Sequence, residues 1–250
     1  MMSDILTFIG VFLIGITASV IGTLVGGGSL LSISFLIFLG LPPQVAIATD
    51  RFGSLGQAIT AFFKFLKAKR IVWKYVLFFA LLSFAGSLIG ANILLNIDTS
   101  ILKNIVGILI FLLLPILFLK RDIGVERGII SKSKMIVGAV LYLLVQVLTG
   151  FLGGGTGTLI FYILMICFGL TIIEASATQL IPVFILNISS VVVFAMNGII
   201  DYRIGIALLA GMATGGYLGA HLALKKGDVW VKRVFFLLLV FMGLKLLFFK

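Results

Sequence analysis

The chain repeats part of its own sequence, and each copy is interrupted by three consecutive glycines. Gly26-Gly27-Gly28-Ser29 in the first half reappears as Gly153-Gly154-Gly155-Thr156 in the second. At a constant offset of 129 residues, Gly40-Leu41 then aligns with Gly169-Leu170. Further pairs keep that offset: Ala46 and Ala175, Ala48-Thr49 and Ala177-Thr178, Ile71 and Ile200, Gly86 and Gly215, Gly90-Ala91 and Gly219-Ala220, and Lys103 and Lys232. A duplicated apolar chain broken by glycine is typical of secondary transporters whose binding site lies between two halves.

Composition places the chain in a membrane. Of its 250 residues 62% are hydrophobic and 11% charged, and five long segments carry no charge at all. A membrane-spanning helix needs roughly 20 apolar residues, so these segments predict several spans. We expect helices at 5–25, 29–40, 44–65, 74–95 and 102–119, and again at 134–152, 157–168, 173–196, 203–224 and 230–249.

The predicted fold is an all-α polytopic membrane protein with two inverted repeats, built from about eight long helices and two short ones. A helix of about 12 residues rises only about 18 Å, against a hydrocarbon core of about 30 Å. Each short helix is therefore expected to form a glycine-broken hairpin with the helix before it, followed by three transmembrane helices. Five crossings per half, with a tilted short helix, remain an alternative. The expected units are repeat 1–119, a basic linker at 120–133 and repeat 134–250.

Charge placement predicts the topology. Three segments, 64–74, 120–134 and 225–233, together account for the whole net charge of +11. Basic loops stay in the cytoplasm, so these three are expected on one side, with both termini outside. The repeat aligns the basic segment 64–74 with a neutral one near Asp201, which predicts halves of opposite orientation. This placement argues for a lipid bilayer, and against nucleic acid, as the partner of the positive charge.

The glycine turns are the first candidate site. Irregular backbone inside a membrane is tolerated only where protein or a water-filled cavity satisfies it. Ser29 and Thr156 directly follow the glycines and are expected to cap the short helices, and a helix N-terminus attracts anions. We therefore predict that Gly26, Gly27, Gly28 and Ser29 bind an anion together with Gly153, Gly154, Gly155, Thr156 and Gly157. The alternative is that the glycines only permit close helix packing, as we expect for Gly86, Gly90, Gly215 and Gly219.

Charged and polar residues near the broken elements extend this site. Arg51 is predicted to contact the anion, and Asp50 to hold Arg51 or to carry a coupling proton. An ion pair at the aqueous end of a helix is the alternative. Thr49 and Thr178 are polar in both halves, so both are candidate substrate ligands. Glu174 is expected to cap the helix it begins. Gln57, Gln146 and Asn187 either pack between helices or line the pathway.

Other functions lack the residues that they require. Cys167 is the only cysteine and His221 the only histidine, so no disulfide or metal triad can form within the chain. No nucleotide-binding glycine loop of the G-x-x-x-x-G-K-[ST] type is present. We therefore expect no enzyme activity, no cofactor and no metal. Nothing in the sequence indicates an oligomeric state.

The chain resembles the TauE/SafE group of sulfite-exporter-like membrane transporters over nearly its whole length. The resemblance is carried by paired motifs, namely 22–29, 40–49, 71–73, 150–157, 175–178, 197–202 and 215–220. It implies movement of small anions, often sulfur-containing acids such as sulfite or organosulfonates, through the inner membrane of a prokaryote. We expect a secondary active transporter that works by alternating access and is coupled to protons. An anion or small-solute channel on the same inverted repeat is the alternative.

Overall fold

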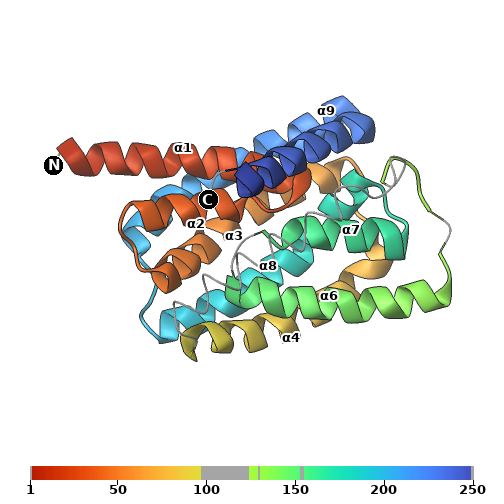
Figure 1. Cartoon of the computed structure of the whole chain (residues 1–250), viewed down its shortest axis with the longest axis horizontal. Helices are drawn as coiled ribbons and strands as arrows, with labels where there is room; N and C mark the ends of the chain where they lie inside the picture. The colour runs from red at the N-terminus through yellow and green to blue at the C-terminus, as the bar shows by residue number, and fades with distance from the viewer. Residues whose placement is uncertain (1, 97–123, 129, 153–154, 249–250) are drawn as a thin grey trace.

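The protein is all-helical in a computed structural model that describes residues 2–96, 124–128, 130–152 and 155–248. Figure 1 shows the long helices packed side by side as a bundle, with two short helices among them. No strand occurs in the described part. The helices are α1 (Met2–Val25), α2 (Ser29–Phe38), α3 (Pro43–Lys67), α4 (Trp73–Asn96), α6 (Lys132–Leu152), α7 (Gly157–Phe168), α8 (Ile172–Met196) and α9 (Tyr202–Phe248).

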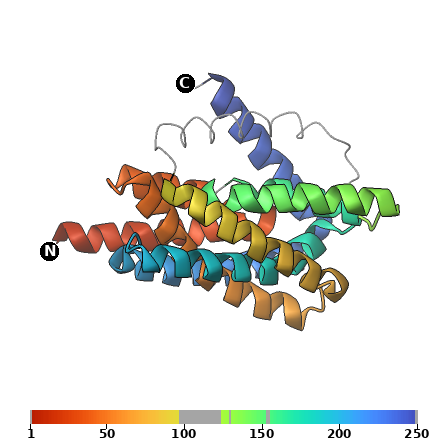
Figure 2. The same cartoon turned by 90° about the horizontal axis from the view of Figure 1, so that it is seen from below.

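The predicted helices are confirmed wherever the structure describes them. The short ones, α2 and α7, have 10 and 12 residues. The two helices expected at 203–224 and 230–249 form the single element α9, which has a non-helical residue at Gly227 (φ 80°, ψ 171°) between them. Figure 2 shows the last part of α9 turning away from the bundle toward the C-terminus. The helix expected at 102–119 lies outside the described residues.

In the described part of the chain, five helices are long and apolar enough to cross a membrane, so the chain is a multi-pass membrane protein. Those five segments are Ile5–Val25, Trp73–Asn96, Lys132–Phe151, Ile172–Met196 and Tyr202–Phe235. α3 is not one of these five segments. With 25 residues it is long enough to cross a membrane, but it carries two charged residues, Asp50 and Arg51, in its first half. Many of the large apolar side chains of these helices are exposed, among them Leu77, Leu144 and Ile206. An apolar exterior of this extent suits lipid rather than water.

The two sequence halves interleave rather than forming separate bodies. α1 packs along α9, while α4 packs on α6 and α8, and α3 lies between α8 and α9 (Figures 1 and 2). Two buried apolar clusters result. One centres on Phe65, Phe79 and Leu164, and the other on Leu36, Leu94 and Phe194. Each cluster contains residues of both repeats, so neither half buries its core alone.

Small residues make the closest of these helix contacts, as predicted. A Cβ added at Gly90 would lie 2.6 Å from the Gly150 Cα, and one at Gly86 would lie 2.7 Å from the Gln146 Cβ. Gly215 and Gly219 stand equally close to α1, as their Cβ atoms would approach Ser19 and Thr23. Packing at this distance is the usual role of glycine and other small residues between membrane helices.

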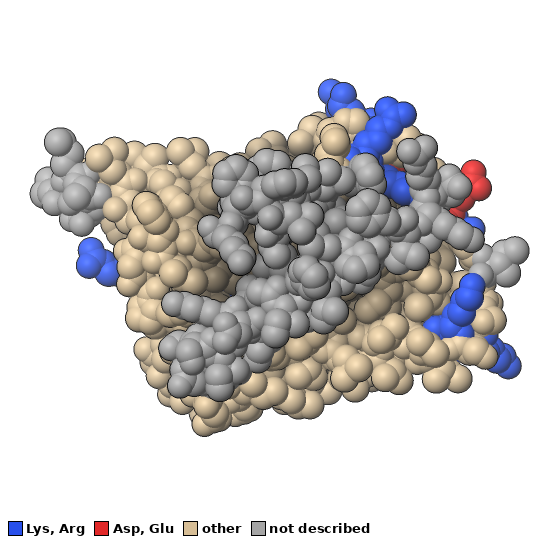
Figure 3. Space-filling view, viewed as in Figure 1, with Lys and Arg blue, Asp and Glu red and all other residues tan. Residues whose placement is uncertain are grey.

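The described parts of the three basic segments lie at one end of the molecule. In the linker, the Gly128 N–H donates to the Gly169 carbonyl at 3.1 Å, and the Gly124 carbonyl accepts from the Ile172 N–H at 2.8 Å. Asp228, just after the α9 break, accepts from the Ile173 N–H at 3.0 Å. Figure 3 shows most of the visible Lys and Arg side chains gathered at this end, which we call the basic end. The opposite end carries the start of α1.

Glu174 caps α8 as expected, but the predicted caps of the short helices are wrong. Thr171 accepts from the Glu174 N–H, and the Glu174 carboxylate accepts from the Thr171 N–H, which is a complete capping box. For α2, the cap residue is Gly28, and Ser29 is already the first helical residue. Thr156 occupies the cap position of α7 without a side-chain capping bond. Its hydroxyl lies instead 2.7 Å from the Thr149 hydroxyl.

Candidate functional site

The two glycine turns meet inside the bundle. Gly26 and Gly27 have φ values of 74° and 75°, and Gly155 has 85°, a conformation that glycine adopts without steric cost. A Cβ added at Gly157 would lie 2.9 Å from the Gly27 nitrogen, and the Thr158 hydroxyl donates to the Val25 carbonyl at 3.3 Å. The starts of α2 and α7 are therefore in direct contact. Gly153 and Gly154 lie outside the described residues.

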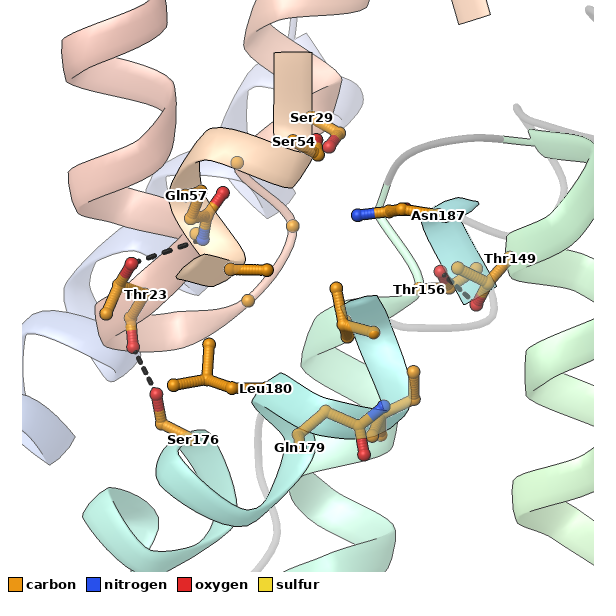
Figure 4. A pocket seen from close by; sticks show the side chains of 18 of the residues that line it. Thr23, Ser29, Ser54, Gln57, Thr149, Thr156, Ser176, Gln179, Leu180 and Asn187 are labelled. Carbon is orange, nitrogen blue, oxygen red and sulfur yellow. Dashed lines mark hydrogen bonds between the residues drawn. The ribbon is translucent and has the colours of Figure 1, made fainter. Parts of the chain in front are cut away.

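A cavity of about 100 Å³ opens beside the two turns. One water needs at least about 10–15 Å³ of such volume, so the cavity holds several waters or one small oxyanion. Figure 4 shows it between α3 on one side and α8 on the other. Polar lining residues are Thr23, Ser29, Arg51, Ser54, Gln57, Thr149, Thr156, Ser176, Gln179 and Asn187, joined by the glycines 26–28, 155 and 157. None of the residues given as lining is an Asp or Glu.

Equivalent positions of the two repeats face each other across this cavity, but their polarity differs. At the offset of 129 residues, Arg51 corresponds to Leu180 and Ser54 to Val183, and all of these line the cavity. In the other direction, Asn187 corresponds to Ala58, and both line it. The repeat thus supplies a paired scaffold. The polar side chains on it are specific to one repeat at each of these positions.

Arg51 is the charged group of the cavity. It is 3% exposed and donates through Nη1 to the Asn187 Oδ1 at 3.2 Å and through Nη2 to the Thr149 carbonyl. These bonds join α3, α6 and α8. The Arg51 Nε has no hydrogen-bond partner among the described residues. A buried guanidinium with a free N–H is poised to donate to a ligand, because a buried donor left unpaired costs about 1–3 kcal/mol.

Two carboxamides add further free donors. Gln179 and Asn187 are 3% and 0% exposed, and their side-chain nitrogens have no partner in the described part of the chain. Figure 4 shows the Asn187 nitrogen directed into the cavity, and the Gln179 nitrogen on the cavity side of its amide. Every unpaired buried side-chain atom found on the described lining residues is thus a donor. Such a set suits a negatively charged ligand and not a cation.

Asp50 lies next to Arg51 in sequence but outside the cavity lining. It is fully buried, and its Oδ1 accepts a hydrogen bond from the Ser32 hydroxyl of α2. Its Oδ2 has no partner among the described residues. The carboxyl therefore links the start of the first short helix to α3. The alternative of an ion pair at an aqueous helix end does not describe these residues, because both are buried.

Thr49 and Thr178 are buried but do not line the cavity. The Thr49 hydroxyl accepts from the Asp201 N–H at 3.1 Å, and the Thr178 hydroxyl accepts from the Val72 N–H at 3.0 Å. Each threonine thus binds the loop that precedes a helix of the other repeat. The structure brings Arg51 and the described glycines to the cavity, together with Ser29 and Thr156, but not these two threonines.

The sequence reasoning missed several lining residues. Gln57 and Asn187, each predicted either to pack between helices or to line the pathway, both line the cavity, whereas Gln146 does not. Ser54, Gln179, Ser176 and Thr149 were not identified at all. Helical spacing in the sequence indicates part of the cavity lining. Arg51, Ser54 and Gln57 recur every three residues, which places them on one face of α3. Gln179 and Asn187 are two turns apart on α8 in the same way.

Long apolar helices around a buried, donor-lined cavity define the chain as a multi-pass membrane transport protein. The family model described as "Sulfite exporter TauE/SafE" matches residues 11–246. The chain belongs to this family of membrane transporters.

Similar proteins are also described as membrane transporters. A "Probable membrane transporter protein" of Haemophilus influenzae is 27% identical over 221 residues, covering 88% of this chain and 87% of the relative. The "Probable membrane transporter protein YfcA" of Escherichia coli K12 is 25% identical over 241 residues, covering 95% and 88%. The YunE protein of Bacillus subtilis, with the same description, is 26% identical and covers 97% and 98%. No solved structure matches the chain.

Proposed function

We propose that this protein is a secondary active transporter of small anions and that the anion binds in the cavity beside the two glycine turns. The observation that carries this proposal is the set of three buried, unpaired donors at Arg51, Gln179 and Asn187. These nitrogens are buried in the cavity wall in this conformation, so an oxyanion would accept from them after a small movement of the wall, which would remove the cost of leaving them unpaired. The backbone amides of Ser29 and Gly157, the first residues of α2 and α7 and both on the cavity lining, would add to them. Arg51 would supply the positive charge.

The substrate class follows from the family and from the cavity. The family description names sulfite, and a cavity of about 100 Å³, enough for several waters, has room for a small oxyanion. We propose sulfite and other small sulfur-containing acids as substrates. A plain carboxylate presents two acceptor oxygens where sulfite presents three, so the donors would share oxygens and we expect weaker binding.

Transport would proceed by alternating access between two inverted halves. The matched bonds of Thr49 and Thr178 support this, because each ties one repeat to the other at corresponding positions. We propose that the basic end faces the cytoplasm. The start of α1, at the opposite end, would then lie on the outer side of the membrane. Asp50 would carry the coupled proton. Its free Oδ2, buried beside Arg51, lets protonation change the charge next to the bound anion without adding a group to the cavity.

The test is transport by purified protein in liposomes with sulfite inside, with and without a pH gradient. Arg51→Met should abolish sulfite transport, and Arg51→Lys should keep a fraction, because lysine keeps the charge but not the fork of donors. Arg127→Gln, which changes an exposed arginine at the basic end, is the matched control and should transport normally. Sulfite transport by Arg51→Met at the normal rate would overturn the proposed site.

The same assay tests the coupling and the transport mode. Asp50→Asn should move sulfite down its own gradient but should no longer accumulate it under a pH gradient. A carrier turns over slowly and saturates with substrate, whereas a channel passes ions at far higher rates without coupling. Uncoupled flux that does not saturate would favour the channel alternative over alternating access.

A further inference from the structure

A second polar cluster lies behind the cavity, and its centre is Tyr142 of α6. The Tyr142 side chain is fully buried and stacks on Phe79 with ring centroids 4.5 Å apart. Its hydroxyl is surrounded by Ser83 of α4, Gln146 of α6 and Gln179 of α8. Of these four polar residues, only Gln179 lines the cavity. The cluster therefore touches the anion site through one side chain.

With the carboxamide oxygens and nitrogens placed as the structure has them, the hydrogen atoms of the cluster have one consistent assignment. The Gln146 amide nitrogen donates to the Ser83 hydroxyl at 2.5 Å and to the Tyr142 hydroxyl at 2.6 Å, which uses both of its hydrogens. The Tyr142 hydroxyl then donates its single hydrogen to the Gln179 Oε1 at 2.7 Å. A carboxamide whose oxygen is engaged on one side presents its nitrogen on the other. The Gln179 nitrogen is left on the cavity side with no partner among the described residues (Figure 4).

We propose that Tyr142 is a positioning residue for the anion site, which holds the Gln179 carboxamide with its N–H groups toward the cavity. Without the hydroxyl, the amide is free to rotate and present its oxygen lone pairs to the anion. Tyr142 thereby makes Gln179 a donor, and so selects for the negative charge of the ligand. The inference rests on the proposed function, since it assigns a role within the same site.

Asn187 is held by the same device on the other side of the cavity. Its Oδ1 accepts from Arg51, and its nitrogen is free. Gln179 and Asn187 thus both have their oxygens engaged by a buried donor and their nitrogens unpaired, whereas the third lining carboxamide, Gln57, donates through its nitrogen to the Thr23 hydroxyl. The ring of Tyr142 packs independently of this bond, because its stacking on Phe79 does not involve the hydroxyl. Removing the hydroxyl alone separates positioning from packing.

The test is a double-mutant cycle on sulfite transport with Tyr142→Phe and Gln179→Leu. Tyr142→Phe should raise the KM for sulfite about 5- to 10-fold, as expected for loss of one oriented hydrogen bond, with the maximal rate changed less than the KM. In the Gln179→Leu background, Tyr142→Phe should have no further effect, because the hydroxyl acts through Gln179. Tyr162→Phe, a tyrosine of α7 whose ring packs on Phe235, is the matched control and should leave the KM unchanged.

Four results would each overturn either the role of Tyr142 or the proposed function. An unchanged KM in Tyr142→Phe, or an equal KM increase in both backgrounds, would show that Tyr142 does not act through Gln179. Normal sulfite transport by Arg51→Met would instead overturn the proposed function. If Tyr142→Phe does not fold, Gln179→Glu decides, because it keeps the acceptor for Tyr142 and replaces the free donor by a carboxylate oxygen. Sulfite affinity of Gln179→Glu equal to the wild type would contradict the donor role.

Discussion

The hydroxyl of Thr178 accepts a hydrogen bond from the backbone N–H of Val72, 106 positions away and in the other repeat. Thr49 makes the corresponding bond to the N–H of Asp201. The first bond lies where α8 begins beside the α3–α4 loop, at the basic end. The second lies where α3 begins beside the α8–α9 loop, at the opposite end. The two bonds therefore join the repeats at both ends of the molecule, so the cavity lies between two matched contacts.

Replacing either threonine by valine should lower stability and not substrate affinity. Thr178→Val keeps the shape of the side chain but leaves a backbone N–H unpaired, which costs about 1–3 kcal/mol. The midpoint of thermal unfolding in detergent should fall, while the KM for sulfite of the folded fraction stays unchanged. Thr178→Ser, which keeps the hydroxyl, is the control. A KM increase in Thr178→Val at unchanged stability would return these threonines to the list of substrate ligands.

Gly26→Ala should prevent the two short helices from meeting. The added Cβ would lie 2.6 Å from the Thr158 nitrogen and 2.8 Å from the Gly157 oxygen, both of them backbone atoms that cannot move aside cheaply. The expected result is loss of sulfite transport together with poor recovery of folded protein.

Gly40→Ala is the matched control for this change. Gly40 also has a positive φ, of 95°, but nothing lies within 4 Å of an added Cβ. Gly40→Ala should lower the free energy of unfolding only by the backbone strain, about 1–2 kcal/mol, and the protein should still transport sulfite. Equal loss of transport in both variants would attribute the effect to backbone strain and not to contact between the glycine turns.

Glu174 should contribute more as a helix cap than as an ion-pair partner. Arg127 contacts its carboxylate at 2.6 Å and 3.1 Å, but the Arg127 side chain is 68% exposed, so solvent screens the pair. Glu174→Gln keeps a capping group and should lower the unfolding midpoint slightly. Glu174→Ala loses both interactions and should lower the unfolding midpoint further. The free energy of unfolding should fall by about 1 kcal/mol. The order is checked by thermal unfolding at low and high salt, and reversal of the order would contradict the capping role.

Asn187→Asp should harm anion binding more than Asn187→Leu. Leucine removes the free donor, while aspartate also places a negative charge in the cavity beside Arg51. We expect a KM increase of about 10-fold for leucine, from loss of a hydrogen bond to a charged ligand, and no measurable transport for aspartate. Ala58→Asn, at the corresponding position of the other repeat, is the control and should bind sulfite at least as well as wild type. Equal KM values for the aspartate and leucine variants would argue against an anion in this cavity.

Helix boundaries could be predicted because their causes are local. The triple glycines predicted where α2 and α7 begin, and the break at Gly227 separates the two segments expected within α9. The prediction that Ser29 caps α2 is wrong because Gly28 occupies the cap position. Hydropathy does not locate the start of a helix to within one residue. Thr49 and Thr178 are a matched pair in the sequence and were predicted as substrate ligands, but neither lines the cavity. Each instead accepts from the backbone of a loop in the other repeat, a contact with no local signal in the sequence.

The repeat, the apolar segments and the glycine breaks were determined by the sequence alone, because hydropathy and backbone freedom depend on neighbouring residues only. Interleaving of the halves and the composition of the cavity were decided by the tertiary structure. Gln179 is the clearest case. Whether its amide offers a nitrogen or an oxygen to the cavity depends on the single hydrogen of Tyr142, which reaches it from another helix.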